Sequence, residues 1–227
     1  MLIPIIYSQD EMDLIKSKKT EMGFNHKSWF DEDLTLIKNS IKTHYHKIQN
    51  GICPYCRQQF NSTHGRYWDI EHIIPRSHVP NFMFEPQNLC MSCVECNSEK
   101  SDKKVTNSSA KNTYPTNTLQ YSIIHPHLDN YEEHLLVVEA GLFYYPLKPK
   151  GRKTIEVCGL NRFYEYAGFG SNGDVFQIIQ ALTTAASTVA DDTIKQQILR
   201  QITALALRGM IKSKKVLTAP YNARLRG

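Results

Sequence analysis

The chain lacks several features that would place it in a membrane or on a secretory route. It contains no apolar run of the roughly 18 residues that a membrane-spanning helix requires. Its first residues, MLIPIIYSQDEMD, have neither the basic start nor the long apolar stretch of a secretory signal. Internal repeats and long low-complexity segments are also missing. We therefore expect a globular cytoplasmic protein that has no membrane partner.

Acidic residues are missing from the last part of the chain. The net charge of the whole sequence is only +5, which is compatible with nucleic-acid binding but is weak evidence for it. After Asp192, however, every charged side chain is basic. This tail predicts either a contact with phosphates or a protein partner, or a solvated helix face, and both readings stay open. Its basic residues are Lys195, Arg200, Arg208, Lys212, Lys214, Lys215, Arg224 and Arg226.

The cysteines are arranged in a way that favours metal binding over disulfides. Two Cys-x-x-Cys pairs occur, and in a cytosolic protein such spacing is typical of a zinc site. Each pair presents two sulfur ligands to one tetrahedral ion, so two pairs complete a structural site. The pairs are Cys53 with Cys56 and Cys93 with Cys96.

Cys90 offers a second register for the zinc site, because Cys90 and Cys93 have the same spacing. The residues that follow Cys96 favour the Cys93/Cys96 pair. We therefore expect Cys90 to be a small buried side chain, and the isolated Cys158 to belong to the core.

The rest of the chain divides into helical and extended segments. Apolar residues recur at helical spacing from Trp29, and Asn50-Gly51 supplies a stop, which predicts a helix that leads to Cys53. Residues 1–28 carry little periodic signal. The segment 134–145 predicts two short strands, and 154–166 a short helix. Residues 174–211 predict a pair of helices, the second capped by Asp191 and Asp192.

Between the cysteine pairs stands a set of polar residues that suits phosphodiester hydrolysis. Residues 69–75 read DIEHIIP, Asn88 precedes Leu89, and Cys96 is followed by NSEK. Hydrolysis needs an activated water, whose proton a neutral imidazole can accept. It also needs charge neutralisation, which Mg²⁺ provides when hard oxygen ligands hold it. His72 is the candidate base, and Glu71 and Asn97 are candidate oxygen ligands.

These elements, in this order, resemble the HNH endonuclease superfamily. The pattern of that family is an acidic–His pair at the end of a strand, Asn-Leu in the next loop, and Cys-x-x-Cys-(His/Asn)-x-x-Lys opening a helix. The resemblance implies an α+β fold, in which zinc staples a ββα-metal core that has an N-terminal helix and a helical C-terminal extension. The expected parts are residues 1–50, a nuclease domain at 51–166, and a helical region at 167–227.

The resemblance also assigns roles to individual residues. His72 would be the general base, and Asn88 would hold the loop and orient His72. Glu71 and Asn97 would bind the catalytic Mg²⁺, for which Mn²⁺ would be a substitute. The family often has Asp in the place of Glu71, so Asp69, on the same strand face, is an alternative metal ligand.

Four basic residues near the motif are candidates for binding nucleic acid. They could neutralise phosphates, although a solvated face explains them almost as well. DNA is the favoured substrate and RNA the alternative. The four residues are Arg76, Lys100, Lys103 and Lys104.

A second resemblance covers roughly residues 30–165. Residues 124–129 read IHPHLD, and TIE and LNR follow at 154–156 and 160–162. This order is similar to the HNH subunits of bacterial anti-phage systems of the Septu type, some of which are linked with retrons. It implies an SMC-like ATPase partner, with the C-terminal helices as the docking element. His125 and His127 would line the nucleic-acid groove or, alternatively, form a buried corner.

Two other functions remain open from the sequence. One is a zinc-stapled binding module for nucleic acid or protein, without catalysis; the presence of all four candidate catalytic residues argues against it. The other is a stand-alone restriction or repair nuclease, which would need a recognition domain of its own. No segment outside the core suggests such a domain, so the sequence favours targeting by a partner.

Overall fold

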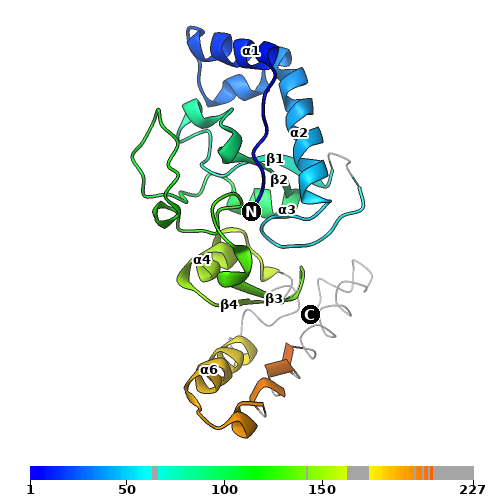
Figure 1. The fold of residues 1–227 in the computed structure, drawn as a ribbon, viewed down its shortest axis with the longest axis vertical. Helices are drawn as coiled ribbons and strands as arrows, with labels where there is room; N and C mark the ends of the chain where they lie inside the picture. The colour runs from blue at the N-terminus through cyan, green and yellow to red at the C-terminus, as the bar shows by residue number, and fades with distance from the viewer. Residues whose placement is uncertain are drawn as a thin grey trace, which may run out of the picture. The chain divides into compact units, whose positions relative to one another are not determined.

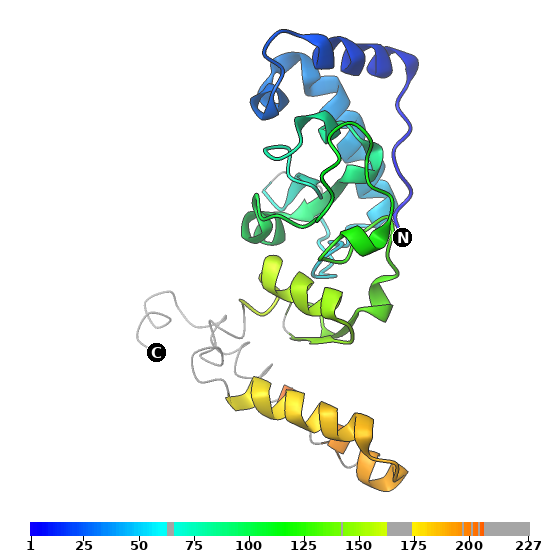
Figure 2. The ribbon, with the colours of Figure 1, turned by 90° about the vertical axis from the view of Figure 1, so that its left-hand side faces the viewer.

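The computed structural model describes residues 1–62, 66–141, 143–162, 174–196, 198–200, 202–203 and 205–206 (Figures 1 and 2). The chain forms two compact units. The first contains Met1–Val137 and Tyr145–Gly159, and the second contains Val138–Tyr144 and Leu160–Gly227. None of the described helices combines the length and the apolar character that crossing a bilayer requires.

A hairpin and a short helix form the middle of the first unit. Strands β1 (Trp68–His72) and β2 (Leu89–Cys93) pair antiparallel, and α3 (Val94–Lys100) follows β2 without a loop. The register sets Glu71 opposite Cys90 and His72 opposite Leu89. Every residue of β2 is buried, so this strand is the core of the unit. The expected ββα arrangement is confirmed.

Helix α2 (Thr35–Gln49) packs against this hairpin (Figure 1). Its buried face carries Ile37, Ile41 and Tyr45 at helical spacing. The helix ends at Asn50, whose backbone adopts the left-handed conformation with φ 49°. Asparagine tolerates this conformation better than most residues, so the predicted stop is confirmed.

The last residue of α2 also bonds to the hairpin. The Gln49 side chain donates to the backbone carbonyl of Met91 at 2.7 Å and accepts from the Met91 N–H at 2.7 Å. One amide therefore satisfies both polar groups of Met91, as a neighbouring strand would. This contact fixes α2 on the outer edge of β2.

Helix α1 (Gln9–Thr20) was not expected from the sequence. Ser8 accepts from the Glu11 N–H and Glu11 accepts from the Ser8 N–H, which forms a capping box. The helix has little amphipathic pattern, so the Ser-x-x-Glu motif was the one sequence signal that could have predicted it. Figure 2 shows the chain running beside α2 before it enters α1, and His44 contacts the Ile3 carbonyl at 2.9 Å there.

Three acidic residues precede α2. Glu32 and Asp33 lie in a short 3-10 turn and Asp31 directly before it, so none of them lies in the first turn of the helix. The buried ammonium of Lys18 lies 3.2 Å from Asp31 and 2.7 Å from Asp33. These ion pairs attach α1 to the start of α2.

Two further strands and a helix follow along the chain. β3 (Leu135–Glu139) and β4 (Phe143–Pro146) form a two-stranded sheet, as predicted. Helix α4 (Pro149–Val157) begins five residues earlier than expected, because Pro149 occupies its first turn, where proline fits a helix well. Of the expected segment 154–166, residues 163–166 lie outside the described residues.

The described residues of the second unit contain helix α6 (Asp174–Thr188) and a second helical stretch. Asp191 accepts from the Thr193 N–H at 2.8 Å and from the Ile194 N–H at 3.1 Å, so Asp191 caps that stretch as predicted. Residues 207–211, the end of the expected helix pair, lie outside the described residues.

Candidate active site and cysteine cluster

The four cysteines of the two pairs converge on one point. Their sulfur atoms all lie within 4.8 Å of one another and are buried. The Sγ atoms of Cys56 and Cys93 are 3.8 Å apart. A tetrahedral zinc with bonds of about 2.3 Å separates its sulfurs by about 3.8 Å, so the cluster has the dimensions of a zinc site. Its members are Cys53, Cys56, Cys93 and Cys96.

Electrostatics in the cluster also suit a cation. Burial alone would raise the pKa of Cys53, but hydrogen bonds from the three neighbouring thiols lower that pKa well below its ordinary value. The cluster thus stabilises a thiolate, which is the form that binds metal.

Cys90 and Cys158 stand apart from the cluster. Cys90 is fully buried among apolar side chains that include Ile73, Val79 and Phe82. Burial raises the pKa values of both thiols well above the ordinary range, so both are neutral core groups. The register that was preferred from the sequence is the one in which the structure groups the cysteines.

Glu71 is held by two donors at the end of β1. The ammonium of Lys100 lies 2.6 Å from Oε1 of Glu71, and the Tyr55 hydroxyl donates to the same oxygen at 3.1 Å. Burial raises the pKa of Glu71, and the charge of Lys100 opposes this shift. Both contacts use Oε1, so Oε2 is the oxygen left for another ligand.

His72 has its ring fixed by a single backbone carbonyl. Nε2 lies 3.1 Å from the carbonyl oxygen of Met83, so Nε2 carries the proton and donates it. Nδ1 is then the nitrogen with the free electron pair. The ring of Trp29 packs edge-on against the imidazole at 4.6 Å. Burial, reinforced by the charge of Arg76, lowers the pKa of His72 to about 3.

Asn97 points its side chain at β1 from the first turn and a half of α3. Its Nδ2 donates to Oδ2 of Asp69 at 2.8 Å. This bond orients the amide and leaves Oδ1 of Asn97 as the acceptor. Asp69, the alternative metal ligand, thus lies beside Asn97 and accepts a hydrogen bond from its side-chain amide.

Asn88 closes the loop between the two strands and is fully buried. Its Oδ1 accepts from the Ile74 N–H at 2.7 Å, and its Nδ2 donates to the carbonyls of Ile74 and Phe82 at 3.1 and 3.0 Å. Phe82 precedes Met83, the residue that holds the His72 ring. Asn88 is therefore linked to the His72 ring through the backbone of the loop.

A pocket of about 410 Å³ joins several of these groups. Glu71, His72 and Asn97 line it together with His26 and Arg76. The Arg76 guanidinium stacks on the Phe30 ring at 5.0 Å, and its Nε donates to the His26 carbonyl at 3.2 Å. The candidate base, the two candidate oxygen ligands and the Arg76 cation thus line one pocket.

The four basic residues proposed for nucleic acid lie in different environments. Arg76 lines the pocket, and Lys104 is exposed beside Pro75 and Val105. Lys103 donates to the Val157 carbonyl at 3.2 Å. The expectation for Lys100 was wrong: its side chain is fully enclosed and its ammonium binds Glu71 and the His72 carbonyl. Lys100 therefore cannot reach a phosphate.

The two histidines of the IHPHLD segment are buried, at 0 and 6% exposure. His125 and His127 therefore do not line a nucleic-acid groove, and the buried-corner alternative holds. His127 donates from Nε2 to the Leu89 carbonyl at 2.8 Å. The corner thus contacts the start of β2.

The sequence did not reveal three residues that shape the site. Tyr55 lies inside the first cysteine pair, where only its position between two ligands could have marked it. Trp29 and the Met83 carbonyl come from segments without a motif. Their contributions depend on the tertiary fold, since Trp29 is 43 positions from His72 in the chain.

The geometry agrees with comparisons to known proteins. Residues 53–103 match the sequence model of the HNH endonuclease family. This segment is therefore similar to HNH endonuclease domains. The Septu protein PtuB of Bacillus thuringiensis is 30% identical over 128 residues, which make up 55% of this chain and 42% of PtuB. The resemblances to HNH nucleases and to Septu-type proteins are thereby confirmed.

The alignment leaves more than half of that relative uncovered, so the chain spans well under the full length of PtuB. No solved structure matches the chain significantly.

Proposed function

We propose that this protein is a metal-dependent endonuclease that hydrolyses phosphodiester bonds, preferentially in DNA. The observation that carries this proposal is the pocket in which His72, Glu71 and Asn97 meet. Support also comes from the HNH match, which covers these three residues.

The chain offers a base that is ready for proton transfer. Because Nε2 of His72 donates to the Met83 carbonyl, Nδ1 is the atom that takes a proton from water. The low pKa of His72 keeps the ring neutral at physiological pH. The edge contact with Trp29 holds the ring at a fixed angle, which lowers the cost of positioning the water.

The oxygen donors in the pocket fit a hard divalent cation such as Mg²⁺ or Mn²⁺. Glu71 would contribute Oε2 and Asn97 would contribute Oδ1, because their other polar atoms are already bonded. When bound, such an ion neutralises negative charge that develops on the phosphate and the leaving oxygen. Arg76 would hold a non-bridging phosphate oxygen with the guanidinium nitrogens that do not contact His26.

We propose zinc as the ion of the cysteine cluster, with a structural role. Four protein ligands close the coordination shell and leave no position for substrate. The ion would fasten α3, which carries Asn97, to the segment before β1.

Cleavage assays on the purified protein test this function. Wild-type protein with Mg²⁺ should cut DNA, and parallel assays on RNA test the substrate preference. His72→Ala should lower the rate by roughly 10²–10⁴-fold, the usual contribution of a positioned base. Asn97→Ala should regain part of its activity at higher Mg²⁺ or with Mn²⁺, while His72→Ala should not.

His78→Ala is the matched control, because His78 is an exposed histidine outside the pocket lining. It should cleave like the wild type. Cleavage without any divalent metal, or full activity of His72→Ala, would contradict the proposal.

We further propose that the protein is a cytoplasmic effector of an anti-phage system and works with an SMC-like ATPase. The similarity to a Septu protein supports the defence role. The helical C-terminal region is the proposed docking element, and it exposes Ile194 and Leu199. Deleting residues 174–227 should reduce co-purification with the ATPase encoded nearby while zinc content is retained. Undiminished co-purification would place docking elsewhere.

A further inference from the structure

The buried corner at His125 has polar contacts that the proposed mechanism has not yet used. His125 is fully buried, and its two ring nitrogens both have partners. Apolar side chains would be enough for packing alone, because they have no polar atoms that need hydrogen-bond partners when buried. The hydrogen-bond partners of His125 therefore indicate which segments the buried corner holds in place.

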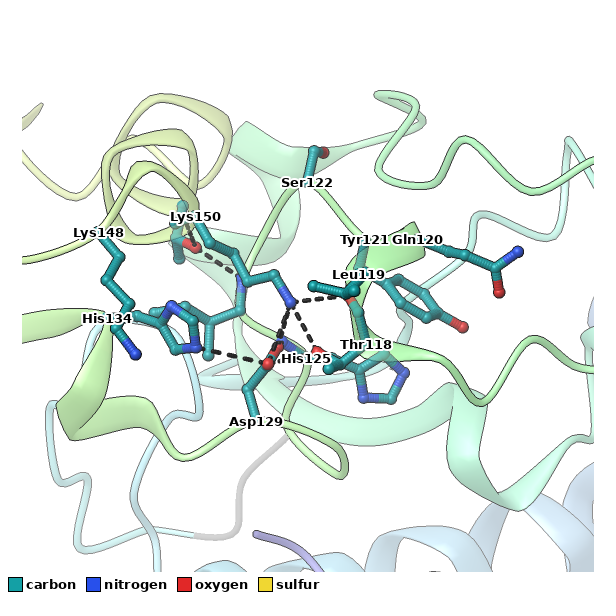
Figure 3. Close-up of polar contacts among 12 residues, drawn as sticks. Thr118, Leu119, Gln120, Tyr121, Ser122, His125, Asp129, His134, Lys148 and Lys150 are labelled. Atoms are coloured by element: carbon teal, nitrogen blue, oxygen red, sulfur yellow. Dashed lines mark hydrogen bonds and ion pairs between the residues drawn. The ribbon is translucent and has the colours of Figure 1, made fainter.

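One side of this corner is anchored by a dense polar group (Figure 3). Oδ2 of Asp129 accepts from the His125 N–H at 2.7 Å. The ammonium of Lys150, on α4, lies 2.9 and 3.0 Å from the two Asp129 oxygens and 2.7 Å from the Thr118 hydroxyl. The Thr118 hydroxyl also donates to Asp129. Asp129 is thus fixed from α4 and from the Thr118 segment, and it holds the backbone of His125.

The other side of the corner is a directional chain of hydrogen bonds. Nδ1 of His125 accepts from the His127 N–H at 3.2 Å, so the ring proton of neutral His125 is on Nε2. Nε2 lies 2.9 Å from the Tyr114 hydroxyl and donates to it. The Tyr114 proton must then point to the other acceptors, which are Oδ1 of Asn88 and the carbonyl of Gln87, each at 3.2 Å.

Asn88 connects this series of hydrogen bonds to the loop between β1 and β2. It receives the Tyr114 and Ile74 donors on Oδ1, which fixes its amide so that Nδ2 faces the carbonyls of Ile74 and Phe82. The next residue, Met83, accepts the Nε2 proton of His72. Each hydrogen bond in this series joins one donor to one acceptor, and all of them form with both histidine rings neutral.

We propose that Tyr114 and His125 are positioning residues for the HNH centre, which act through Asn88 and the Phe82–Met83 backbone to set the orientation of the His72 ring. This inference rests on the proposed function in that it assigns His72 as the base. The corner does not touch substrate. Its effect is to select the Nε2–H tautomer of His72 and so leave Nδ1 as the acceptor nitrogen.

The test uses Tyr114→Phe in the full chain, with Tyr121→Phe as the matched control. Phenylalanine keeps the ring that packs on Phe82 and His125 and removes only the hydroxyl. Tyr121 is also buried and its ring also contacts His125; its hydroxyl interacts with that of Tyr114, but it donates its own proton to the Pro115 carbonyl and not to Asn88 or Gln87. Tyr114→Phe removes the hydroxyl that accepts from His125 and donates toward Asn88 and Gln87, and Tyr121→Phe removes the donor to Pro115, so Tyr114→Phe should be the less stable variant and both are compared where they are fully folded.

The first readout is the nitrogen and Nε2–H signals of His72 in long-range ¹⁵N–¹H spectra of histidine-labelled protein. Wild type should show the Nε2–H tautomer for His72 and for His125. Tyr114→Phe should shift the His72 signals and speed exchange of its Nε2–H, while Tyr121→Phe should leave both as in the wild type. Unchanged His72 signals in Tyr114→Phe, or equal changes in both variants, would overturn the proposal.

The second readout is cleavage kinetics, at a temperature where both variants are fully folded. Tyr114→Phe should lower kcat on the order of tenfold, the effect of one misdirected hydrogen bond, with KM for DNA unchanged. Tyr121→Phe should keep the wild-type kcat. A loss of kcat that is equal in both variants would also overturn the proposal. If wild-type protein cleaves nothing, the proposed function fails, and the spectra still decide the positioning role.

Discussion

The Nζ atom of Lys100 lies 2.6 Å from Oε1 of Glu71 and 3.0 Å from the backbone carbonyl oxygen of His72. One ammonium therefore fixes two consecutive residues at the end of β1, the candidate metal ligand and the candidate base. The lysine that ends the motif is thus an internal support of the site.

Replacing this lysine should cost much of the stability. Lys100→Met removes one partner of a fully buried ion pair, and such a loss typically costs about 3–5 kcal/mol because the remaining charge is left uncompensated. Urea unfolding would measure the change in the free energy of unfolding. Lys104→Met, at an exposed position, should change it by less than about 0.5 kcal/mol.

The double variant Lys100→Met with Glu71→Gln provides an internal check. It removes both charges, so it should be more stable than Lys100→Met alone. Equal stability of the two would show that the ion pair does not carry the effect.

The cysteine cluster predicts a defined zinc content. Elemental analysis should find about one zinc for each chain, since four thiolates make one structural site. Cys56→Ser and Cys93→Ser should yield unfolded or aggregated protein, because a structural zinc supplies roughly 10–16 kcal/mol of apparent folding free energy.

Cys90→Ala is the control for this experiment. Cys90 is equally buried but lies in the apolar core, so the variant should retain its zinc. A zinc-free wild type that is fully folded, or loss of zinc in Cys90→Ala, would contradict the assignment.

Buried neutral histidine predicts a loss of stability in mild acid. Burial lowers the pKa of His125 to about 3, while an unfolded chain has an ordinary histidine with a pKa of about 6.5. Below pH 6.5 the unfolded state binds a proton that the folded state does not bind. The contribution of His125 is therefore complete above that pH and falls by up to about 1.4 kcal/mol for each pH unit down to about pH 3.

His125→Gln isolates the contribution of His125 to the pH dependence, because the contributions of the other titrating groups are shared by both proteins and cancel. The gap in unfolding free energy between the two proteins should narrow as pH falls from 7 to 5. His78→Gln, at an exposed position, should run parallel to the wild type. A gap that stays constant over this range would refute the prediction.

A single glycine permits the close approach of α4 to the segment before β3. A Cβ atom at Gly151 would lie 1.9 Å from the carbonyl oxygen of His134. Gly151→Ala should therefore destabilise the protein by more than about 1 kcal/mol, even though alanine is the better helix former by about that amount. Thermal unfolding measures the change, with Lys153→Ala on the same helix as the control.

If Gly151→Ala raised the melting temperature, the helix could not lie as close to His134 as it does here. A fall that matched that of Lys153→Ala would lead to the same conclusion.

The sequence predicted the parts of the site that depend on local spacing. The two Cys-x-x-Cys pairs, the Glu71-His72 pair and Asn88 each occupy positions that chain geometry alone constrains. The helix that ends at Asn50 followed from apolar periodicity and a favourable stop residue. These are short-range signals, and they hold wherever the segment is placed.

Burial of charged groups could not be predicted in the same way. Lys100 has the sequence context of an exposed helical lysine, and only the packing of α3 on β1 encloses it. The two histidines at 125 and 127 likewise gave two readings until Tyr114 and Leu89 were placed against them. Helix α1 has weak amphipathicity, and its stability depends on ion pairs of Lys18 with residues that follow it in the chain.

Cys93 contributes to the hairpin, to the start of helix α3 and to the four-cysteine cluster. It is the last residue of β2, it caps α3, and its sulfur lies among the four thiols. In the hairpin it pairs with Trp68, and that same register sets Glu71 opposite Cys90. A slip of one residue would turn every side chain of one strand to the opposite face. The four-cysteine cluster and the pocket beside Glu71 would then be lost together, so a metal ion bound by the four cysteines would stabilise only the correctly paired hairpin.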